Sequence, residues 1–425
     1  MSSFNNCIKF DLDIKDENIV LKDYFYKMVQ MKKHKIYEVE LIQPACPYCG
    51  SLALLHNGHL ITNIRYLTAN ASLPVIIRLA KQRVKCRACD HWSMAQSELV
   101  NKYCSISNAS KLKVLSALTE DRSMTSIARE NNVSVNTVQR VLGSCSHRFL
   151  DSYEYLPAHL AFDEFKGVDR QLHFICLDGD NHQVVQILRT RYKKTLLKYF
   201  GRFSPQARAN VKTVTMDLNF YYQDIVRACF PNAQIVIDRF HMIQMLTRSF
   251  NSLRVQVMKT FDKRSRQYQL LKSPWKLYLK KFDELEKAHP RYNWHYKDCL
   301  TQAQVVMEGI NTSTTLENSY NLMQSFIQAV ETGNTHELKS LINCQDQIGT
   351  LMHKTLLTFK HNLTAVLNGA ALPYSNGCLE GFNRKIKQIE RTAFGYSNFI
   401  NLLTRIRLEE NQYKEKEPNS LLMTA

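Results

Sequence analysis

The stretch HLAFDEFKGVDRQLHFICLDGDNHQVVQILR, residues 159–189, contains three short runs rich in β-branched and aromatic residues. The sequence DGDN, residues 178–181, separates the second run from the third. Runs of this length, bounded by turn residues, are typical of neighbouring antiparallel strands. The stretch therefore predicts a three-stranded antiparallel meander with Asp163 inside its first strand.

The next segment extends this sheet. The pattern predicts a basic helix over residues 192–200, a strand VKTVTMD ending at Asp217, a helix over residues 219–229 and a strand AQIVID ending at Asp238. Three strands, a helix and a further strand, with acids on the first and after the fourth, describe a ribonuclease-H-like fold. We therefore expect a mixed sheet of this class.

A late helix is expected in SNGCLEGFNRKIKQIERTAFGYSNF, residues 375–399. At about 100° per residue, an apolar stripe faces inward, and the opposite stripe holds Glu380, Arg384, Lys387 and Arg391. One interpretation is a solvent-exposed helix face on which Glu380 forms an ion pair with a basic residue at i,i+4. The alternative is a carboxylate that reaches a metal site, followed by cations that contact DNA phosphates.

Asp163, Asp217 and Glu380 are thus the expected catalytic and metal-binding residues. Cleaving a phosphodiester with water or a 3′-hydroxyl requires two divalent ions about 4 Å apart rather than a protein nucleophile. Mg²⁺, or Mn²⁺ in its place, suits carboxylate oxygens. Glu164 should point to the opposite face of its strand. Asp238 is the serious rival, although a single strand-terminal Asp is more often a helix cap.

The composition points to a polyanionic partner. The 425 residues carry 56 Lys and Arg against 38 Asp and Glu, a net charge of +18, which attracts nucleic acid first. No apolar run approaches the roughly 18 residues of a membrane span, and the N-terminus lacks a signal-peptide profile. We therefore expect an intracellular protein, cytoplasmic or associated with the nucleoid.

Two cysteine pairs, in PACPYCG and KCRACD, indicate a metal site. Cys46, Cys49, Cys86 and Cys89 form two knuckles that together can hold one structural Zn²⁺ with four thiolates. The gap between the pairs is longer than usual for a ribbon, but two β-like runs fill it. His56, His59 and His91 are alternative ligands, and four unrelated thiols are the other reading.

The segment SMTSIARENNVSVNTVQRVLG, residues 123–143, has the pattern of a helix-turn-helix. Its apolar positions predict two helices joined at Asn131-Asn132-Val133. The outward residues of the second helix are types that read base edges in a major groove. They are Asn136, Thr137, Gln139 and Arg140. Any short helical hairpin can show this pattern, but the basic charge favours DNA binding.

A helical region over residues 239–367 mixes basic and aromatic residues. Its aromatics either stack on unpaired bases near a strand end or pack inward on amphipathic helices. The residues in question are Trp275, Tyr278, Tyr292, Trp294 and Tyr296.

From about Cys46 to Leu408 the sequence resembles the ISL-three family of insertion-sequence transposases, most clearly in AFDEFKG, in TMDLNFYYQDIVRACFPNAQIVIDRFH and in residues 375–399. The resemblance implies a zinc-binding segment, a helix-turn-helix and a DDE catalytic domain with an insertion before Glu380. It places the DDE residues on Asp163, Asp217 and Glu380, and makes Asp238-x-x-His241 an auxiliary element. It further implies a bacterial host and a homodimer or higher oligomer that binds terminal inverted repeats and target DNA.

The sequence therefore predicts a multidomain α+β protein. The expected parts are an arm (1–40, with one short helix near 21–32), a zinc-binding ribbon (41–100), a helix-turn-helix domain (104–150), a ribonuclease-H-like mixed-sheet catalytic domain (155–240 and 372–417), an all-helical insertion (241–371) and a tail (418–425). The rival functions are a transposase-derived DNA-binding regulator without catalysis and a structure-specific DNA nuclease.

Overall fold

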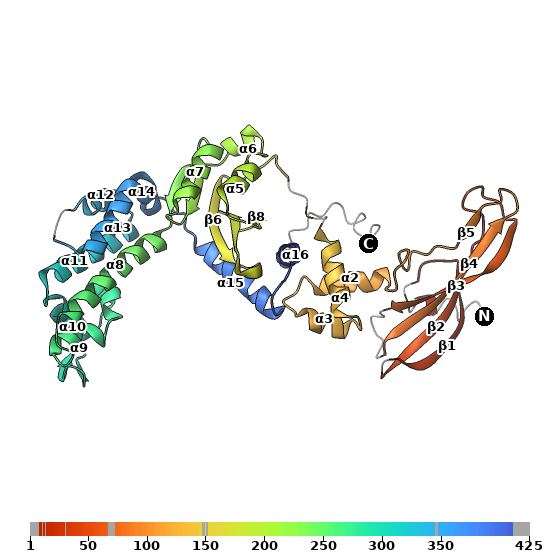
Figure 1. Cartoon of the computed structure of the whole chain (residues 1–425), viewed down its shortest axis with the longest axis horizontal. Coiled ribbons are helices and arrows are strands. Elements are labelled where there is room, and N and C mark those ends of the chain that lie inside the picture. Colours follow the sequence, from red (N-terminus) through yellow and green to blue (C-terminus); the bar gives the residue numbers. More distant parts are fainter. Residues whose placement is uncertain are drawn as a thin grey trace. The chain divides into compact units, whose positions relative to one another are not determined.

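In a computed structural model the chain forms two compact units, residues 1–150 with 386–425, and residues 151–385. The structure describes residues 8–10, 12, 14–29, 31–66, 73–146, 149, 152–344 and 347–410, so the expected tail lies outside the described residues. Figure 1 follows the elements along the chain. None of the helices in these ranges is long and apolar enough to span a membrane.

The second unit is built on a five-stranded sheet in the order β10-β9-β6-β7-β8. Its strands are β6 (His159–Lys166), β7 (Leu172–Asp178), β8 (Val184–Leu188), β9 (Thr213–Met216) and β10 (Gln234–Ile237). β6, β7 and β8 pair antiparallel, whereas β9 runs parallel to β6, and β10 runs parallel to β9. The predicted meander and mixed sheet are therefore confirmed.

Aromatic packing fixes one face of this sheet. The strands are flanked by α5 (Lys193–Phe200), α6 (Pro205–Ala209) and α7 (Phe220–Cys229). Phe162 of β6 is fully buried and packs against Phe174, Phe200 and Tyr222 with ring centroids 5.0–6.2 Å apart. Because side chains alternate along a strand, burying Phe162 turns the next residue, Asp163, to the other face.

A long insertion follows β10. Its helices are α8 (Arg239–Lys259), α9 (Arg266–Lys272), α10 (Gln302–Ile310), α11 (Thr314–Thr332), α12 (Thr335–Ile342), α13 (Thr350–His361) and α14 (Leu363–Ala371). The expectation of an all-helical insertion is wrong in one place, where β11 (Arg291–Asn293) and β12 (Asp298–Leu300) form a hairpin. Tyr292 in β11 is of a residue type that favours strands. Helix α15 (Gly377–Thr392) comes next.

The first unit contains a second five-stranded sheet, in the order β1-β2-β4-β3 with β5 paired to β4. Its strands are β1 (Ile19–Val29), β2 (Lys32–Leu41), β3 (Leu54–Tyr66), β4 (Val75–Cys86) and β5 (Trp92–Met94). The expected arm with a short helix near residues 21–32 is therefore wrong. β1 is rich in β-branched and aromatic residues, but it is mostly exposed on both faces, so no single apolar face reveals it in the sequence.

The helices of the first unit follow this sheet. They are α2 (Asn108–Ala117), α3 (Met124–Glu130), α4 (Val135–Ser144) and, near the C-terminus, α16 (Phe399–Glu409). Between α3 and α4, Asn132 has φ of 49°, a left-handed conformation that asparagine tolerates. Ser134 then caps α4 by accepting a hydrogen bond from the backbone N–H of Thr137 at 3.2 Å.

Candidate functional site

Three aspartates lie level across neighbouring parallel strands. Every residue pair between β6 and β9 differs by 54 positions, so continuing this register places Asp163 level with Asp217. Every pair between β9 and β10 differs by 21 positions, which places Asp217 level with Asp238. Neighbouring strands lie about 4.8 Å apart. The sheet therefore forms a row of three carboxylates, which we call the aspartate row.

The charges of the aspartate row interact. Burial, together with the nearby charge of Asp217, raises the pKa of Asp163 to about 6, although the hydrogen bond from the backbone N–H of Glu164 opposes the shift. A buried carboxylate beside a like charge resists ionisation. The two expected ligands, Asp163 and Asp217, are thus brought together in a place that a divalent cation would stabilise.

His241, one turn into α8, joins the other two members of the row. Its Nδ1 lies 2.8 Å from Asp217 Oδ1 and 3.2 Å from Asp238 Oδ2. These bonds, to Asp217 first and Asp238 second, raise the pKa of His241 to about 10. Ligand atoms of Asp217, Asp238 and His241 lie within 4.8 Å of one another, close enough to hold a metal ion.

Asp238 is the N-cap residue of α8, but its carboxylate pairs with His241 and accepts the backbone N–H of Asn376. It occupies the residue before α8, but its side chain makes no capping hydrogen bond. Burial would raise the pKa of this carboxyl, but bonds from His241 and from the backbone N–H of Asn376 lower it. Its buried carboxylate contributes to the aspartate row, which the preference for a cap did not anticipate.

Glu380 lies beside the row but outside its hydrogen bonds. It is exposed on α15, and its carboxylate pairs with Arg384 at 2.5 Å. Asn376 lies within 3.5 Å of Asp217, and Asn383 lies 2.8 Å from Asp163. Residues 376, 380 and 383 share one stripe of a helix. Glu380 therefore stands between two residues that touch the aspartate row, while its own carboxylate is paired with Arg384.

The two asparagines were missed in the sequence, where amides at positions 376 and 383 carry no recognisable spacing. Glu164 behaved as expected and points away from Asp163. Arg191 donates to both of its oxygens at 2.8 Å, and the hydroxyl of Tyr222 donates to Oε2 at 3.1 Å. Glu164 is thus part of the packing on the opposite face of the sheet.

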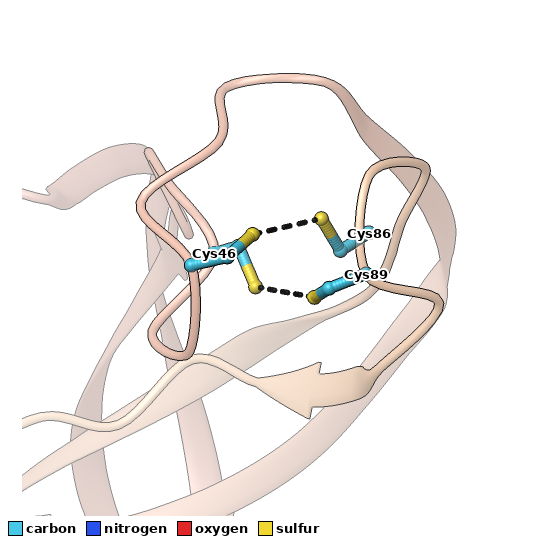
Figure 2. A group of neighbouring side chains, drawn as sticks. Cys46, Cys86 and Cys89 are labelled. Atoms are coloured by element: carbon cyan, nitrogen blue, oxygen red, sulfur yellow. Dashed lines mark hydrogen bonds between the residues drawn. The ribbon is translucent and has the colours of Figure 1, made fainter.

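Ligand atoms of the four knuckle cysteines lie within 4.8 Å of one another, and Figure 2 labels Cys46, Cys86 and Cys89 of this group. Sγ of Cys46 lies 3.6 Å from Sγ of Cys89, and Sγ of Cys49 lies 3.5 Å from Sγ of Cys86. Tetrahedral zinc with Zn–S bonds of about 2.3 Å places sulfurs about 3.8 Å apart. Backbone N–H groups of Cys89 and Ala88 help lower the pKa of Cys86 to about 6, which favours the thiolate. These residues fit a structural zinc site.

Both knuckles have the same backbone. The N–H of Gly50 donates to the carbonyl of Cys46 at 2.9 Å, and the N–H of Asp90 donates to that of Cys86 at 3.1 Å. Gly50 and Asp90 have φ of 72° and 58°, so each knuckle ends in a left-handed residue. The predicted strands between the pairs, β3 and β4, are confirmed as the arms of the ribbon.

The proposed DNA-contacting residues divide into exposed and buried ones. Asn136, Gln139 and Arg140 of α4 are exposed. Thr137 is only 5% exposed, so its expected outward position is wrong. Its side chain instead lies beside that of Ser134 at the start of α4, with 3.0 Å between the hydroxyl oxygens. On α15, Arg384, Lys387 and Arg391 are exposed.

The aromatics of the insertion divide in the same way. Tyr278 and Tyr296 are buried, so they pack inward. Trp294 is 82% exposed and Tyr292 is 52% exposed, and their rings meet edge to face at the β11–β12 hairpin. Trp275 is 40% exposed. Stacking of these exposed rings on unpaired bases stays a prediction.

Known proteins match the chain in both units. The family described as "Transposase", DDE type of the ISL3 group, matches residues 160–406. The "zinc-finger of transposase IS204/IS1001/IS1096/IS1165" matches residues 42–89. The chain is 22% identical over 378 residues to the transposase for insertion sequence element IS1001 of Bordetella parapertussis, covering 85% of this chain and 87% of that protein.

A shorter similarity involves a protein named ATP-dependent protease, from Lactococcus lactis subsp. lactis. It is 30% identical over 109 residues, which cover 26% of this chain and 35% of that protein. The activity in its name is therefore not assigned to this chain. The transposase family, by contrast, matches more than half of the chain and includes the whole aspartate row, α15 and Glu380. The chain belongs to the ISL3 family of insertion-sequence transposases, enzymes that cut and join DNA.

Proposed function

We propose that Asp163, Asp217 and Glu380 hold two divalent ions for DNA strand cleavage and strand transfer at the ends of an insertion sequence. The observation that carries the proposal is the register of Asp163 with Asp217 across β6 and β9, with α15 beside them. The strand order β10-β9-β6-β7-β8 also supports a ribonuclease-H-like assignment.

The residues present fit Mg²⁺. Asp163, Asp217 and Asp238 offer carboxylate oxygens, the ligands that this ion prefers. When bound, a pair of such ions activates the attacking oxygen and stabilises the leaving oxygen. In this proposal His241 fixes the orientation of Asp217 and Asp238 through the hydrogen bonds of its Nδ1. Arg384, Lys387 and Arg391 contact DNA phosphates along the exposed stripe of α15.

We further propose that the first unit recognises the DNA sequence at the ends of the element. Gln139 and Arg140 of α4, with Asn136, read base edges of the terminal inverted repeats, and the zinc ribbon supports them. Joining two transposon ends to a target requires several duplexes in one complex, so we propose a homodimer or a larger assembly on DNA.

The decisive experiment is a cleavage and strand-transfer assay with the full-length protein, Mg²⁺ and duplexes that carry the element's ends. Asp163→Asn, Asp217→Asn and Glu380→Gln should each abolish both reactions and leave duplex binding intact. Glu164→Gln removes a neighbouring carboxylate from the opposite face and should retain activity.

Three outcomes point elsewhere. Binding without cleavage by the wild-type protein would favour the DNA-binding regulator. Cleavage without strand transfer would favour the structure-specific nuclease. If Glu380→Gln remained active while Asp238→Asn did not, the third metal-binding carboxylate would be Asp238, and the assignment of Glu380 would be wrong.

A further inference from the structure

Two asparagines of the α15 segment contact the aspartate row on either side of Glu380. Nδ2 of Asn383 donates to Oδ2 of Asp163 at 2.8 Å. The other oxygen of Asp163 accepts the backbone N–H of Glu164 at 2.7 Å. Asn383 therefore helps to fix the rotation of this carboxylate.

Asn376 makes a larger set of contacts. It is only 6% exposed. Its backbone N–H donates to Oδ1 of Asp238 at 3.0 Å, and its Nδ2 lies 3.2 Å from the carbonyl oxygen of Phe162 and 3.5 Å from Oδ1 of Asp217. Its own carbonyl accepts the N–H of Glu380 at 3.1 Å. One residue thus connects β6 and the residues that follow β9 and β10 with the helix that carries Glu380.

The side-chain amide oxygens of the same two asparagines are the next feature of the site. Within the part of the chain that the structure describes, Oδ1 of Asn376 and Oδ1 of Asn383 are buried and accept no hydrogen bond. Buried polar atoms of native proteins are almost always satisfied, by protein, water or an ion. Both unpaired oxygens belong to side chains whose NH₂ groups contact the aspartate row. We therefore expect the hydrogen-bond donors for these oxygens to lie beside the row.

We propose that Asn376 and Asn383 are positioning residues of the metal site: their NH₂ groups orient Asp217 and Asp163, and their carbonyl oxygens accept hydrogen bonds from water that divalent ions carry into the site. This inference rests on the proposed two-ion function. Mg²⁺ gives up its water reluctantly and keeps several molecules when bound to protein. A site for it therefore needs acceptors for those waters as well as carboxylates.

The test is a titration of the full-length, zinc-loaded protein with Mn²⁺, with the free ion followed by electron paramagnetic resonance. Loss of residues that support metal ligands typically weakens metal affinity about 10–100-fold, and we expect this range for Asn383→Ala and Asn376→Ala. The matched control is Asn368→Ala. Asn368 donates to the carbonyl of Ile235 in β10 at 3.0 Å, and among the described residues no hydrogen bond joins its side chain to the aspartate row, so its loss should leave Mn²⁺ affinity unchanged.

Comparison with Asn368→Ala separates this role from a merely structural one. Asn383 and Asn368 each donate a side-chain hydrogen bond, so both alanine variants should lower the thermal stability of the protein without added Mn²⁺, but only Asn383→Ala should weaken Mn²⁺ binding. Equal Mn²⁺ affinity of the two variants would make Asn383 a structural residue. Asn383→Asp places a carboxylate beside Asp163 that can itself bind the ion, so it should bind Mn²⁺ at least tenfold more tightly than Asn383→Ala if position 383 reaches the site.

The outcomes are distinct. If Asp163→Ala loses Mn²⁺ binding while Asn383→Ala and Asn376→Ala bind like the wild-type protein, the inference about the amides is overturned and the proposed function stands. If Asp163→Ala also binds Mn²⁺ normally, the proposed function fails. Should Asn376→Ala not fold, Asn383→Ala, Asn383→Asp and Asn368→Ala still decide the question.

Discussion

Replacing Asp163 by asparagine should stabilise the second unit at pH 8 in the absence of Mg²⁺ and Mn²⁺. Burial and the charge of Asp217 raise the pKa of Asp163 from its ordinary value of 3.8 to about 6. One pKa unit corresponds to about 1.4 kcal/mol, so an ionised Asp163 costs the folded state about 3 kcal/mol at pH 8. An amide at this position carries no charge and avoids that cost.

The direction of the pH dependence follows from the raised pKa. A carboxyl whose pKa is higher in the folded state stabilises it below its unfolded pKa, and this contribution is lost as pH rises through the folded pKa. Asp163→Asn should therefore change the free energy of unfolding little at about pH 4. The gain should grow between about pH 4 and pH 6 and be complete above about pH 7.

Hydrogen bonding reduces the gain slightly. Asp163 accepts two bonds, from the N–H of Glu164 and from Nδ2 of Asn383, whereas an amide has one oxygen. A lost hydrogen bond costs about 1 kcal/mol. Asn383 can turn its side-chain amide so that its unpaired Oδ1 accepts the new NH₂ group, so we expect a net gain of about 2–3 kcal/mol.

Urea unfolding of the zinc-loaded, full-length protein measures this effect. Of the three tryptophans, Trp92 lies in the first unit, while Trp275 and Trp294 lie in the second. In a Trp92→Phe background the fluorescence therefore reports unfolding of the second unit. The midpoint at pH 8 should rise with an unchanged slope, because the substitution exposes no new surface.

Glu164→Gln is the matched control. It removes a carboxylate from the adjacent residue, but this one accepts bonds from Arg191 and Tyr222, so its loss should lower the midpoint at pH 8. If Asp163→Asn also lowered the midpoint, or raised it equally at pH 4 and pH 8, the argument from a buried charge would be refuted.

Four further measurements test other parts of the molecule. Metal analysis should find about one zinc per chain, and Cys86→Ser should lose it and unfold the ribbon; full retention of zinc would exclude Cys86 as a ligand. Gln139→Ala should reduce discrimination between terminal-repeat and random duplexes by about 1–3 kcal/mol in a competition assay; unchanged discrimination would remove Gln139 from the reading surface. Arg384→Ala should weaken binding to all duplexes and lower the salt slope of log K by about 0.9; an unchanged slope would mean a solvated helix face. Arg239→Ala should slow cleavage without changing duplex affinity, because Arg239 holds the segment that leads into α15; an unchanged rate would show that α15 is held elsewhere.

The sheet and its acids were predictable because local patterns specified them. The runs AFD, TMD and VID each place an aspartate directly after an apolar residue. Parallel strands in register then bring Asp163, Asp217 and Asp238 level. A single aspartate at the end of a strand suggests a helix cap, and it is the family resemblance that makes Asp238 an auxiliary residue. The offsets of 54 positions between β6 and β9 and 21 positions between β9 and β10, which only strand pairing establishes, reveal the three aspartates as one row.

Other contacts depend on tertiary structure that no local pattern encodes. Asn376 meets Asp217, 159 positions earlier in the chain, and Asn383 meets Asp163, 220 positions earlier. Thr137 lies at an outward position by helical periodicity, yet its contact with Ser134 and the packing around it bury it. The β1–β2 hairpin lacks one apolar face because most of β1 is exposed, so its periodicity did not distinguish strand from helix.

The insertion leaves and rejoins the sheet at a single place, and this explains how distant residues share one site. Arg239 directly follows Asp238, and its guanidinium donates to the carbonyl of Gly369 at 2.7 Å and to that of Leu372. A Cβ on Gly369 would stand 2.1 Å from the carbonyl oxygen of Ile237, so glycine is required where α14 passes β10. The entropic cost of closing a loop rises only slowly with its length. With its two ends joined in this way, the insertion can be long without moving α15 away from the aspartate row.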